Sequence, residues 1–254
     1  MRPYILAESN WKDLKKQNVD LAVLPWGATE AHNYHLPYAT DNYQVEALVA
    51  EAGKLAWDKG IKVTILPVVP FGVNTGQPDI KLDMNLNPST QLVILRDLIT
   101  VLNRQGINKL LVVNGHGGNN FKPLLRELGL EFPNMFLSLC NWFQIAKSEV
   151  QFQEDGDHAD EMETSLMLYL KPDLIRPLNE AGDGSEKKSV ITGIREGWAW
   201  AEREWSKVSA DTGIGNPKHA TGVKGKEIFK VVSNKLANLI TEIANMDPDN
   251  KYSG

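Results

Sequence analysis

The sequence predicts an α/β fold in which helices cover both faces of a mostly parallel β-sheet. Segments with strand character alternate with segments of helical periodicity, and the connections between them are short. The predicted strands are nearly continuous apolar runs, as expected for strands that are buried on both faces. The chain has 254 residues, 42% of them hydrophobic, so it can bury a large core, and we expect residues 1–254 to form one domain.

Each predicted strand is a short apolar run bounded by turn-forming or polar residues. The run at residues 19–25 ends at Pro25 and is followed by Gly27, which is typical of a strand that leaves the sheet. By the same criterion the predicted strands are residues 19–25, 62–69, 109–114 and 135–139.

The predicted helices carry apolar residues three or four positions apart, which places them on one face. In residues 89–105 the apolar stripe follows Ser89, a candidate N-cap, and Gly106 acts as the stop signal. The predicted helices are residues 43–58, 89–105, 119–131, 161–170 and 223–245.

Composition excludes several classes of protein. The formal net charge of −5 argues against nucleic acid as the main partner. No apolar run is long enough to cross a membrane, and residues 1–4 show no signal sequence, so we expect a cytoplasmic protein without a membrane partner. Cys140 is the only cysteine, which excludes an intrachain disulfide, and its apolar surroundings predict a packing role rather than a catalytic thiol.

The histidines indicate where the chemistry lies. The chain has five, and His32, His116 and His158 each fall in a segment that follows a predicted strand, with carboxylates close to His32 and His158 in the sequence. Because ligands bind beyond the carboxyl ends of parallel strands, these segments are expected to meet at one edge of the sheet. Imidazole nitrogen and carboxylate oxygen together suit zinc, manganese or iron.

The spacing of the acidic residues supports a metal site. Glu30 and His32 are one residue apart, so in an extended backbone they point the same way. Asp41 lies just before a predicted helix, and its two oxygens can bridge two cations. We therefore predict a metal site formed by Glu30, His32, Asp41 and His116.

Other polar residues near these motifs have structural explanations that remain open. His35 is predicted to have a structural or supporting role. We expect Gly117, Gly118 and Asn119 to contact the substrate, since glycines let the backbone approach a ligand closely, although Asn119 can also orient a ligand or cap a helix.

Four motifs occur in a fixed order along the chain, and together they cover most of it. They are Gly27–His32 with His35-Leu36-Pro37 and Asp41, Asn114–Asn119, His158–Glu161 with Glu163-Thr164-Ser165, and Gly215-Asn216-Pro217 with Ala220-Thr221 and Lys224-Gly225. In these motifs the chain resembles the creatininase (creatinine amidohydrolase) family. The resemblance implies a three-layer α/β/α sandwich, a dinuclear metal centre, a small-molecule amide substrate and a homo-oligomer, often a hexamer.

The resemblance also implies roles for individual residues. Glu30, His32, Asp41 and His116 would be metal ligands, with Asp41 bridging two ions and Glu163 as a fifth ligand. His158 would be the catalytic histidine that passes a proton to the leaving nitrogen. The expected activity is hydrolysis of a non-peptide or cyclic amide C–N bond by a metal-bound hydroxide, with two zinc ions as the first expectation and manganese or iron as alternatives.

Two departures from the family pattern affect these expectations. In creatininase itself an aromatic residue and a ligating glutamate follow the histidine of the second motif, whereas Gly117 and Gly118 stand here, so Glu163 or Glu161 must replace the ligand. Residues 72–79 lack the His and Phe-Pro-Gly-Thr pattern that usually lines the pocket. We therefore expect a substrate other than creatinine.

Several functional alternatives stay open at this point. Within the family they are a formamide hydrolase and a peptidase that acts on a modified peptide. Outside it, a non-catalytic metal-binding scaffold is the rival, although a pure binder would have no need of His158. Trp198, Trp200 and Trp205 are explained equally by packing, by a subunit contact or by a pocket wall.

Overall fold

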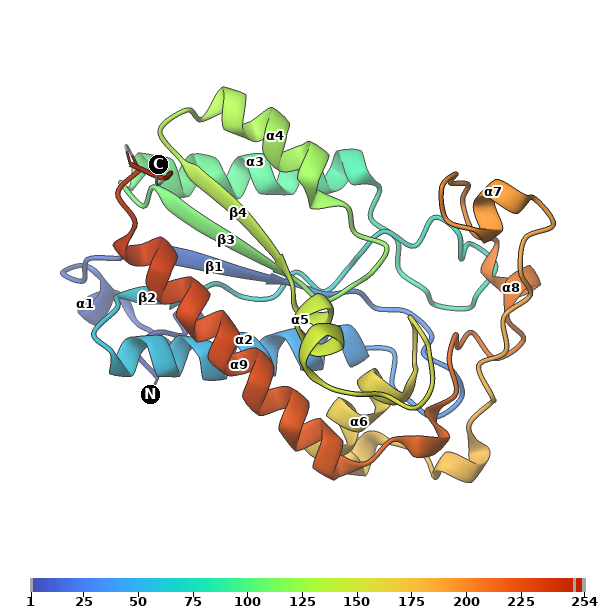
Figure 1. Ribbon diagram of the computed structural model, residues 1–254. Helices are drawn as coiled ribbons and strands as arrows, with labels where there is room; N and C mark the ends of the chain where they lie inside the picture. The colour runs from blue at the N-terminus through green and yellow to red at the C-terminus, as the bar shows by residue number, and fades with distance from the viewer. Residues whose placement is uncertain (1, 249, 253–254) are drawn as a thin grey trace.

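The core of the molecule is a four-stranded sheet in which every strand pairing is parallel (Figure 1). The computed structural model describes residues 2–248 and 250–252. The strands lie in the order β2-β1-β3-β4. Their bounds are β1 Leu21–Trp26, β2 Val63–Ile65, β3 Lys109–Asn114 and β4 Phe136–Asn141. The parallel α/β class predicted from the sequence is confirmed.

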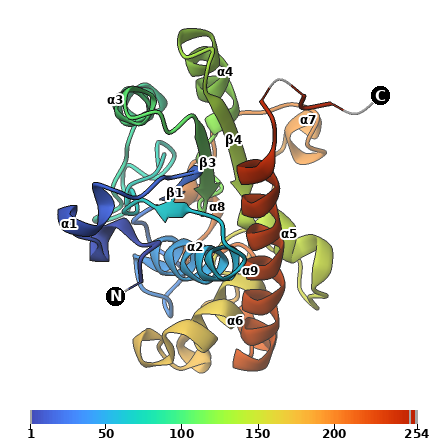
Figure 2. The same ribbon diagram turned by 90° about the vertical axis from the view of Figure 1, so that its left-hand side faces the viewer.

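Helices cover both faces of this sheet, which gives three layers (Figures 1 and 2). One face carries α3 (Pro88–Arg104) and α4 (Phe121–Glu131). The other face carries α2 (Thr40–Asp58), α5 (Trp142–Glu149), α6 (Glu161–Leu170) and α9 (Gly222–Asn245).

Two apolar clusters explain why the strands are continuous apolar runs. Leu21 and Val23 of β1 pack in the cluster that contains residues of α2 and α9, whereas Leu24 and Trp26 pack with residues of α3 and α4. Because successive side chains of a strand point to opposite faces, a strand between two helical layers needs apolar residues at every position.

The element bounds differ from the predicted ones in a few places. β2 has three residues rather than eight, although the N–H groups of Leu66 and Val69 still donate to the carbonyls of Val23 and Pro25 of β1. Ser89 is not an N-cap, because α3 begins at Pro88 and Asn87 is the capping position. The helix α5 directly after β4 is absent from the prediction.

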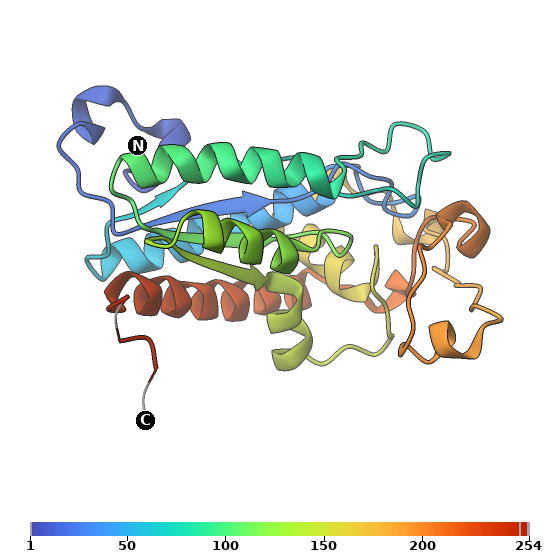
Figure 3. The same ribbon diagram turned by 90° about the horizontal axis from the view of Figure 1, so that it is seen from above.

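Short helices lie in the connecting segments. They are η1 Leu6–Glu8, α1 Trp11–Leu14, η2 Pro172–Leu174, η3 Leu178–Glu180, α7 Thr192–Arg195, α8 Trp205–Val208 and η4 Pro217–His219. Seen from above, the segments that carry α7 and α8 lie beyond the carboxyl end of the sheet (Figure 3). In the part of the chain that the structure describes, no helix is both long and apolar enough to span a membrane.

Candidate metal centre

Six side chains with metal-binding atoms meet at the carboxyl end of the sheet. All six are buried. Two come from the loop after β1, one from the first turn of α2, one from the loop after β3 and two from the start of α6 and the residues before it. They are Glu30, His32, Asp41, His116, His158 and Glu163, the six residues that the sequence predicted for the metal and catalytic positions.

Asp41 lies between two histidines. Its Oδ1 is 3.1 Å from Nε2 of His32, and its Oδ2 is 3.2 Å from Nδ1 of His116. The residue belongs to the first turn of α2, where the positive end of the helix dipole stabilises a carboxylate. Each carboxylate oxygen therefore faces a different imidazole, which is the arrangement that a bridging ligand requires.

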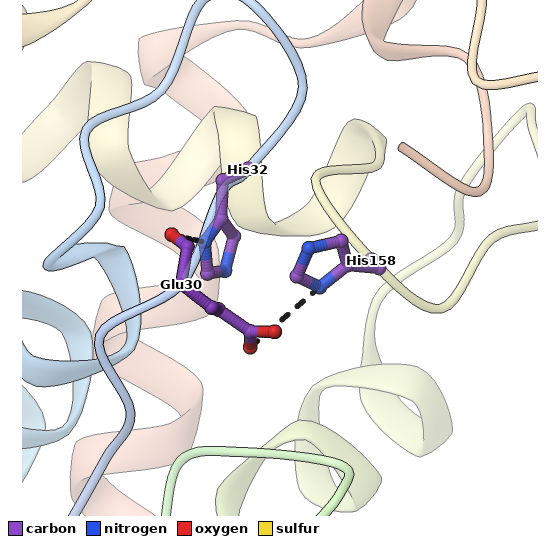
Figure 4. Close-up of side chains that lie close together, drawn as sticks. All are labelled: Glu30, His32 and His158. Carbon is purple, nitrogen blue, oxygen red and sulfur yellow. Dashed lines mark hydrogen bonds and ion pairs between the residues drawn. The ribbon is translucent and has the colours of Figure 1, made fainter. Parts of the chain in front are cut away.

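Glu30 and Glu163 complete the set from opposite sides. Oε1 of Glu30 is 2.7 Å from Nδ1 of His116 and 4.0 Å from Nδ1 of His158, as Figure 4 shows for the latter pair. Oε2 of Glu163 is 3.9 Å from Nε2 of His32. Three overlapping groups result, each with its atoms within 4.8 Å of one another: Glu30, His32 and His158; Glu30, Asp41 and His116; and His32, Asp41 and Glu163.

Each of the three histidines is held by its outer ring nitrogen on a backbone carbonyl. Nε2 of His116 donates to the carbonyl of Val73 at 2.9 Å, and Nε2 of His158 donates to that of Ala31 at 2.8 Å. Nδ1 of His32 lies 3.1 Å from the carbonyl of Glu30. A carbonyl only accepts, so these partners assign the proton to the outer nitrogen and leave the inner nitrogen directed at the centre. This orientation is typical of histidines that bind metals.

Opposite charges govern the pKa values in the centre. Burial favours the neutral form of His32, yet the carboxylate of Asp41 overcomes it and raises the pKa of His32 to about 10. Burial likewise opposes a charge on His116, but Glu30 and Asp41 raise its pKa well above the ordinary value. For Glu163, burial together with the nearby carboxylates raises the pKa to about 8. His158 behaves differently, because burial and the charge of His32 lower its pKa.

Two buried carboxylate oxygens indicate that these residues suit a cation. Oε1 of Glu30 and Oδ2 of Asp41 have no well-aligned hydrogen bond among the described residues. Buried carboxylate oxygens are costly unless a donor or a cation satisfies them. A set of three carboxylates and at least two imidazoles fits zinc or manganese, so the residues present fit a divalent ion.

Comparison with known proteins agrees with this geometry. The family profile described as "Creatininase: Creatinine amidohydrolase" matches residues 7–240. The chain belongs to the creatininase family. This agrees with the resemblance found in the four sequence motifs.

Three relatives of this creatininase-family chain are informative. A Bacteroides fragilis NCTC 9343 protein, provisionally named a creatinine amidohydrolase, is 40% identical, with a TM-score of 0.90 over 98% of this chain and 99% of that chain. The mycofactocin precursor peptide peptidase of Mycobacterium ulcerans (strain Agy99) is 25% identical over 244 residues, which cover 89% of this chain and 85% of the peptidase. A mutant creatininase of the Zn–Zn type shares the fold with a TM-score of 0.78 at 22% identity, over 97% of this chain and 100% of that chain.

The loop after β3 explains how this member of the creatininase family differs from creatininase itself. A Cβ atom at Gly118 would collide with Nε2 of His116 and with the carbonyl of Val73, so the backbone here has no room for a side chain. At Gly117 a Cβ atom would meet nothing within 4 Å. A glutamate at position 118 therefore does not fit this conformation of the loop.

Of the two glutamates offered as replacement, only Glu163 reaches the centre. Glu161 is paired with Lys224 and accepts hydrogen bonds from the backbone of Gln153 and Glu154. Glu163 is directed at the centre by a short turn in which Ala159 adopts a φ of 51° and donates its N–H to Oε2 of Glu163 at 2.6 Å. The left-handed backbone at Ala159 is thus part of the support of the site.

Other residues predicted near the site are engaged elsewhere. Asn119 donates to Oδ1 of Asn114, and its own Oδ1 accepts from Val73 and Gln91, so its side chain braces the loop. His35 is buried and lies 2.8 Å from the hydroxyl of Thr164, in agreement with a supporting role. Substrate contact by Gly117, Gly118 and Asn119 stays a prediction.

Cys140 is half-buried beside the core, in agreement with a packing role. Burial raises the pKa of its thiol to about 11, so the thiol stays protonated at neutral pH.

Sequence reasoning missed the loop between β2 and α3 as a support of the centre. Gln77 donates from Nε2 to Oε2 of Glu30 at 2.5 Å, and Asp83 accepts from the N–H of Ala31 at 2.7 Å. Trp205 packs edge-on against His158, with ring centroids 4.8 Å apart. Gln77 and Asp83 lie far along the chain from their partners and share no motif with them, so the only available signal was the unusual composition of residues 72–79. Trp205 belongs to the aromatic group for which the sequence left a pocket wall open.

Proposed function

We propose that this protein is a metal-dependent amidohydrolase that binds two divalent ions. Glu30, Asp41 and His116 would hold one ion, and His32, Asp41 and Glu163 would hold the other, with Asp41 shared. The observation that carries the proposal is the buried cluster in which the inner nitrogens of His32 and His116 face carboxylate oxygens of Asp41 and Glu30. Such ions supply a nucleophilic hydroxide at neutral pH and stabilise negative charge on a carbonyl oxygen.

In the proposed reaction, His158 moves the proton. Its lowered pKa leaves the ring neutral at neutral pH, and its hydrogen bond to Ala31 directs Nδ1 inward. The ring can therefore accept a proton from the attacking water and deliver it to the nitrogen. The water oxygen forms the new bond to the carbonyl carbon, the C–N bond breaks, and the amine leaves with the transferred proton. Trp205 would hold the His158 ring and shield it from solvent.

The substrate we propose is an amide other than creatinine. The loop of residues 72–79 directs Gln77 and the Val73 carbonyl at metal-centre residues. A second candidate is cleavage of a modified peptide, favoured by the relative named a mycofactocin precursor peptide peptidase that aligns with 89% of this chain. Formamide hydrolysis is a third possibility within the same chemistry.

We further propose a cytoplasmic homo-oligomer, with the hexamer as the expected form. Support comes from Trp198 and Trp200, which are 74% and 82% exposed on the segment beyond the sheet. Large aromatic side chains are enriched at subunit interfaces. Zinc is the first expectation for both ions and manganese the second, since creatininase structures of a Zn–Zn type and of an Mn form are similar to this one in fold.

The test is an assay of metal content and hydrolysis together. Purified protein is loaded separately with zinc, manganese and iron and assayed on formamides, cyclic amides and short peptides. The wild type should bind two ions per chain and hydrolyse one substrate class, and His116→Ala should lose both an ion and the activity. Full activity in a metal-free protein would overturn the proposal. Tight binding of two ions without hydrolysis of any of these amides would favour the non-catalytic scaffold.

A further inference from the structure

Gln77 lies at the edge of the centre and touches one of the proposed ligands. Gln77 is only 3% exposed, and its Nε2 donates to Oε2 of Glu30 at 2.5 Å. The residue belongs to the loop between β2 and α3, 47 positions along the chain from Glu30. This buried amide lies outside the four family motifs, so they do not explain why it is there.

The hydrogen bond from Gln77 gives the two oxygens of Glu30 different partners. Gln77 occupies Oε2, while Oε1 faces Nδ1 of His116 at 2.7 Å and has no well-aligned hydrogen bond. The carboxylate is therefore held in one rotation about its last bond, with a single free oxygen toward the centre. A neutral donor achieves this without bringing a positive charge that would repel a cation.

Gln77 is itself rigidly supported. Its backbone N–H donates to the carbonyl of Asn74 at 3.0 Å, and the Asn74 side chain donates to the carbonyl of Met84 at 3.1 Å. On the outer side, the N–H of Trp205 donates to the carbonyl of Gly76 at 3.1 Å, and Gly76 has no room for a Cβ atom beneath the backbone of Arg203. Little conformational freedom is left for the amide to lose when it orients Glu30.

The amide of Gln77 makes its hydrogen bonds through Nε2 alone, which also donates to Oδ1 of Asn74 at 3.4 Å. Its Oε1 is buried and has no hydrogen-bond partner among the described residues. Turning the amide over would place Oε1 against the Glu30 carboxylate, and two acceptors cannot form a hydrogen bond. The amide has the orientation that gives Glu30 a hydrogen-bond donor, and its own oxygen is left without a donor.

We infer that Gln77 is a positioning residue that makes Glu30 a one-oxygen ligand of the ion shared with Asp41 and His116. The inference rests on the proposed function, since it requires the centre to hold metal. Gln77 would act on only one of the two ions, because the ion-pair contacts of His32 with Asp41 and Glu163 do not include Gln77. The loop of residues 72–79 would then tune metal affinity.

The test is a titration of metal-free protein with Co²⁺, followed by visible absorption and by competition with a chromophoric chelator. Gln77→Met removes the donor at similar volume, and Gln77→Glu keeps the shape but places a carboxylate against Glu30. Ser233→Ala is the control, because Ser233 is a buried polar residue with an unpartnered Oγ, but it lies in α9 and is not one of the residues of the centre.

The wild type should bind two Co²⁺ ions. In Gln77→Met one of them should bind about 10- to 100-fold more weakly with a changed absorption spectrum, the range typical for lost support of a metal ligand. The second ion should bind as in the wild type, the loss should be larger in Gln77→Glu, and Ser233→Ala should match the wild type in affinity and spectrum.

Two results would count against different parts of the argument. Two ions in the wild type with unchanged affinities and spectrum in both Gln77 variants, or an equal effect in Ser233→Ala, would overturn the inference alone. A wild type that binds no Co²⁺ would overturn the proposed function and the inference with it. If Gln77→Met does not fold, as judged by circular dichroism, Gln77→Glu decides the question.

Discussion

Asp41 has the central place in the site because each of its oxygens faces a different histidine. Glu30 also faces two histidines, His116 and His158, but it does so with one oxygen, Oε1. Asp41 is also the residue on which the two-ion proposal depends most directly.

Asp41→Asn is therefore expected to lose both ions, and Glu163→Gln only one. Each affected ion should bind at least tenfold more weakly, which is about 1.4 kcal/mol. The measurement is elemental analysis by mass spectrometry after dialysis against metal-free buffer. Retention of two ions by Asp41→Asn would show that Asp41 is not shared.

Gly118 gives a prediction about stability. Because a Cβ atom there would collide with His116 and Val73, Gly118→Ala should lower the free energy of unfolding by about 1–3 kcal/mol. Gly117→Ala is the matched control, since nothing lies within 4 Å of its Cβ position, and its effect should stay within about 0.5 kcal/mol. Chemical denaturation measures both, and equal stability of the two variants would contradict the collision.

Metal binding should release protons. His32, with its pKa raised to about 10, and His116, with its pKa raised well above the ordinary value, carry protons at neutral pH that a metal ion must displace. Raising the pH removes these protons, so metal affinity should increase from neutral pH toward about 10. Calorimetric titration in two buffers with different heats of ionisation measures the release, and a heat that is independent of the buffer would refute it.

At the scale of elements, the start of α6 joins helix capping to the site. Asp160 is the N-cap of this helix and accepts from the N–H of Glu163 at 3.0 Å. The same turn therefore caps the start of the helix and orients a proposed metal ligand. The start of α9 has a similar cap, in which Thr221 accepts from the N–H of Lys224 at 3.2 Å. The other hydrogen bonds of Thr221 among the described residues reach Ser165 and Gly225, and none reaches the six central residues.

Removing these two caps should separate stability from metal binding. Asp160→Ala and Thr221→Ala should each lower stability by about 1 kcal/mol. Only Asp160→Ala should also weaken the ion held by Glu163, while Asp160→Asn, which keeps a capping oxygen, should restore the stability. Thermal unfolding with and without added zinc gives both quantities. The same zinc response in both alanine variants would separate the cap from the site.

Much of this element structure could be predicted, for identifiable reasons. The strands were evident because both faces of the sheet are covered, which requires apolar residues at each position, as in β3. The proposed ligands were evident because parallel strands deliver their following loops to one edge. The helix α5 was missed because it begins directly after β4, with Asn141 as both the last residue of the strand and the capping position of the helix.

The contacts of Gln77 and Asp83 could not be predicted from the sequence. They depend on how a loop without regular structure folds across the end of the sheet, and their partners lie 47 and 52 positions away.

At the scale of the whole molecule, the segment beyond the sheet has two parts with different surroundings. Trp205 lies against His158, whereas Trp198 and Trp200 are exposed. Of the explanations offered for these tryptophans, a pocket wall therefore suits Trp205, and a subunit contact suits Trp198 and Trp200.

Trp200→Ser should thus reduce the assembly state without changing the fold. We expect a shift toward smaller species in light scattering coupled to gel filtration, with an unchanged circular dichroism spectrum. Trp11→Ser is the matched control, because Trp11 is similarly exposed at 76% but lies on α1, near the amino terminus. An unchanged molar mass for Trp200→Ser would exclude this tryptophan from the interface.

The positions of the central residues along the chain have a consequence for biosynthesis. Glu30, Asp41 and His116 have all left the ribosome before Glu163 is made, since the chain emerges amino terminus first. β1 and β3 are neighbours in the sheet, so their pairing can assemble one set of donors while the rest of the polypeptide is still being translated. The other set waits for α6, so in the proposed two-ion centre the second ion would be loaded late in maturation.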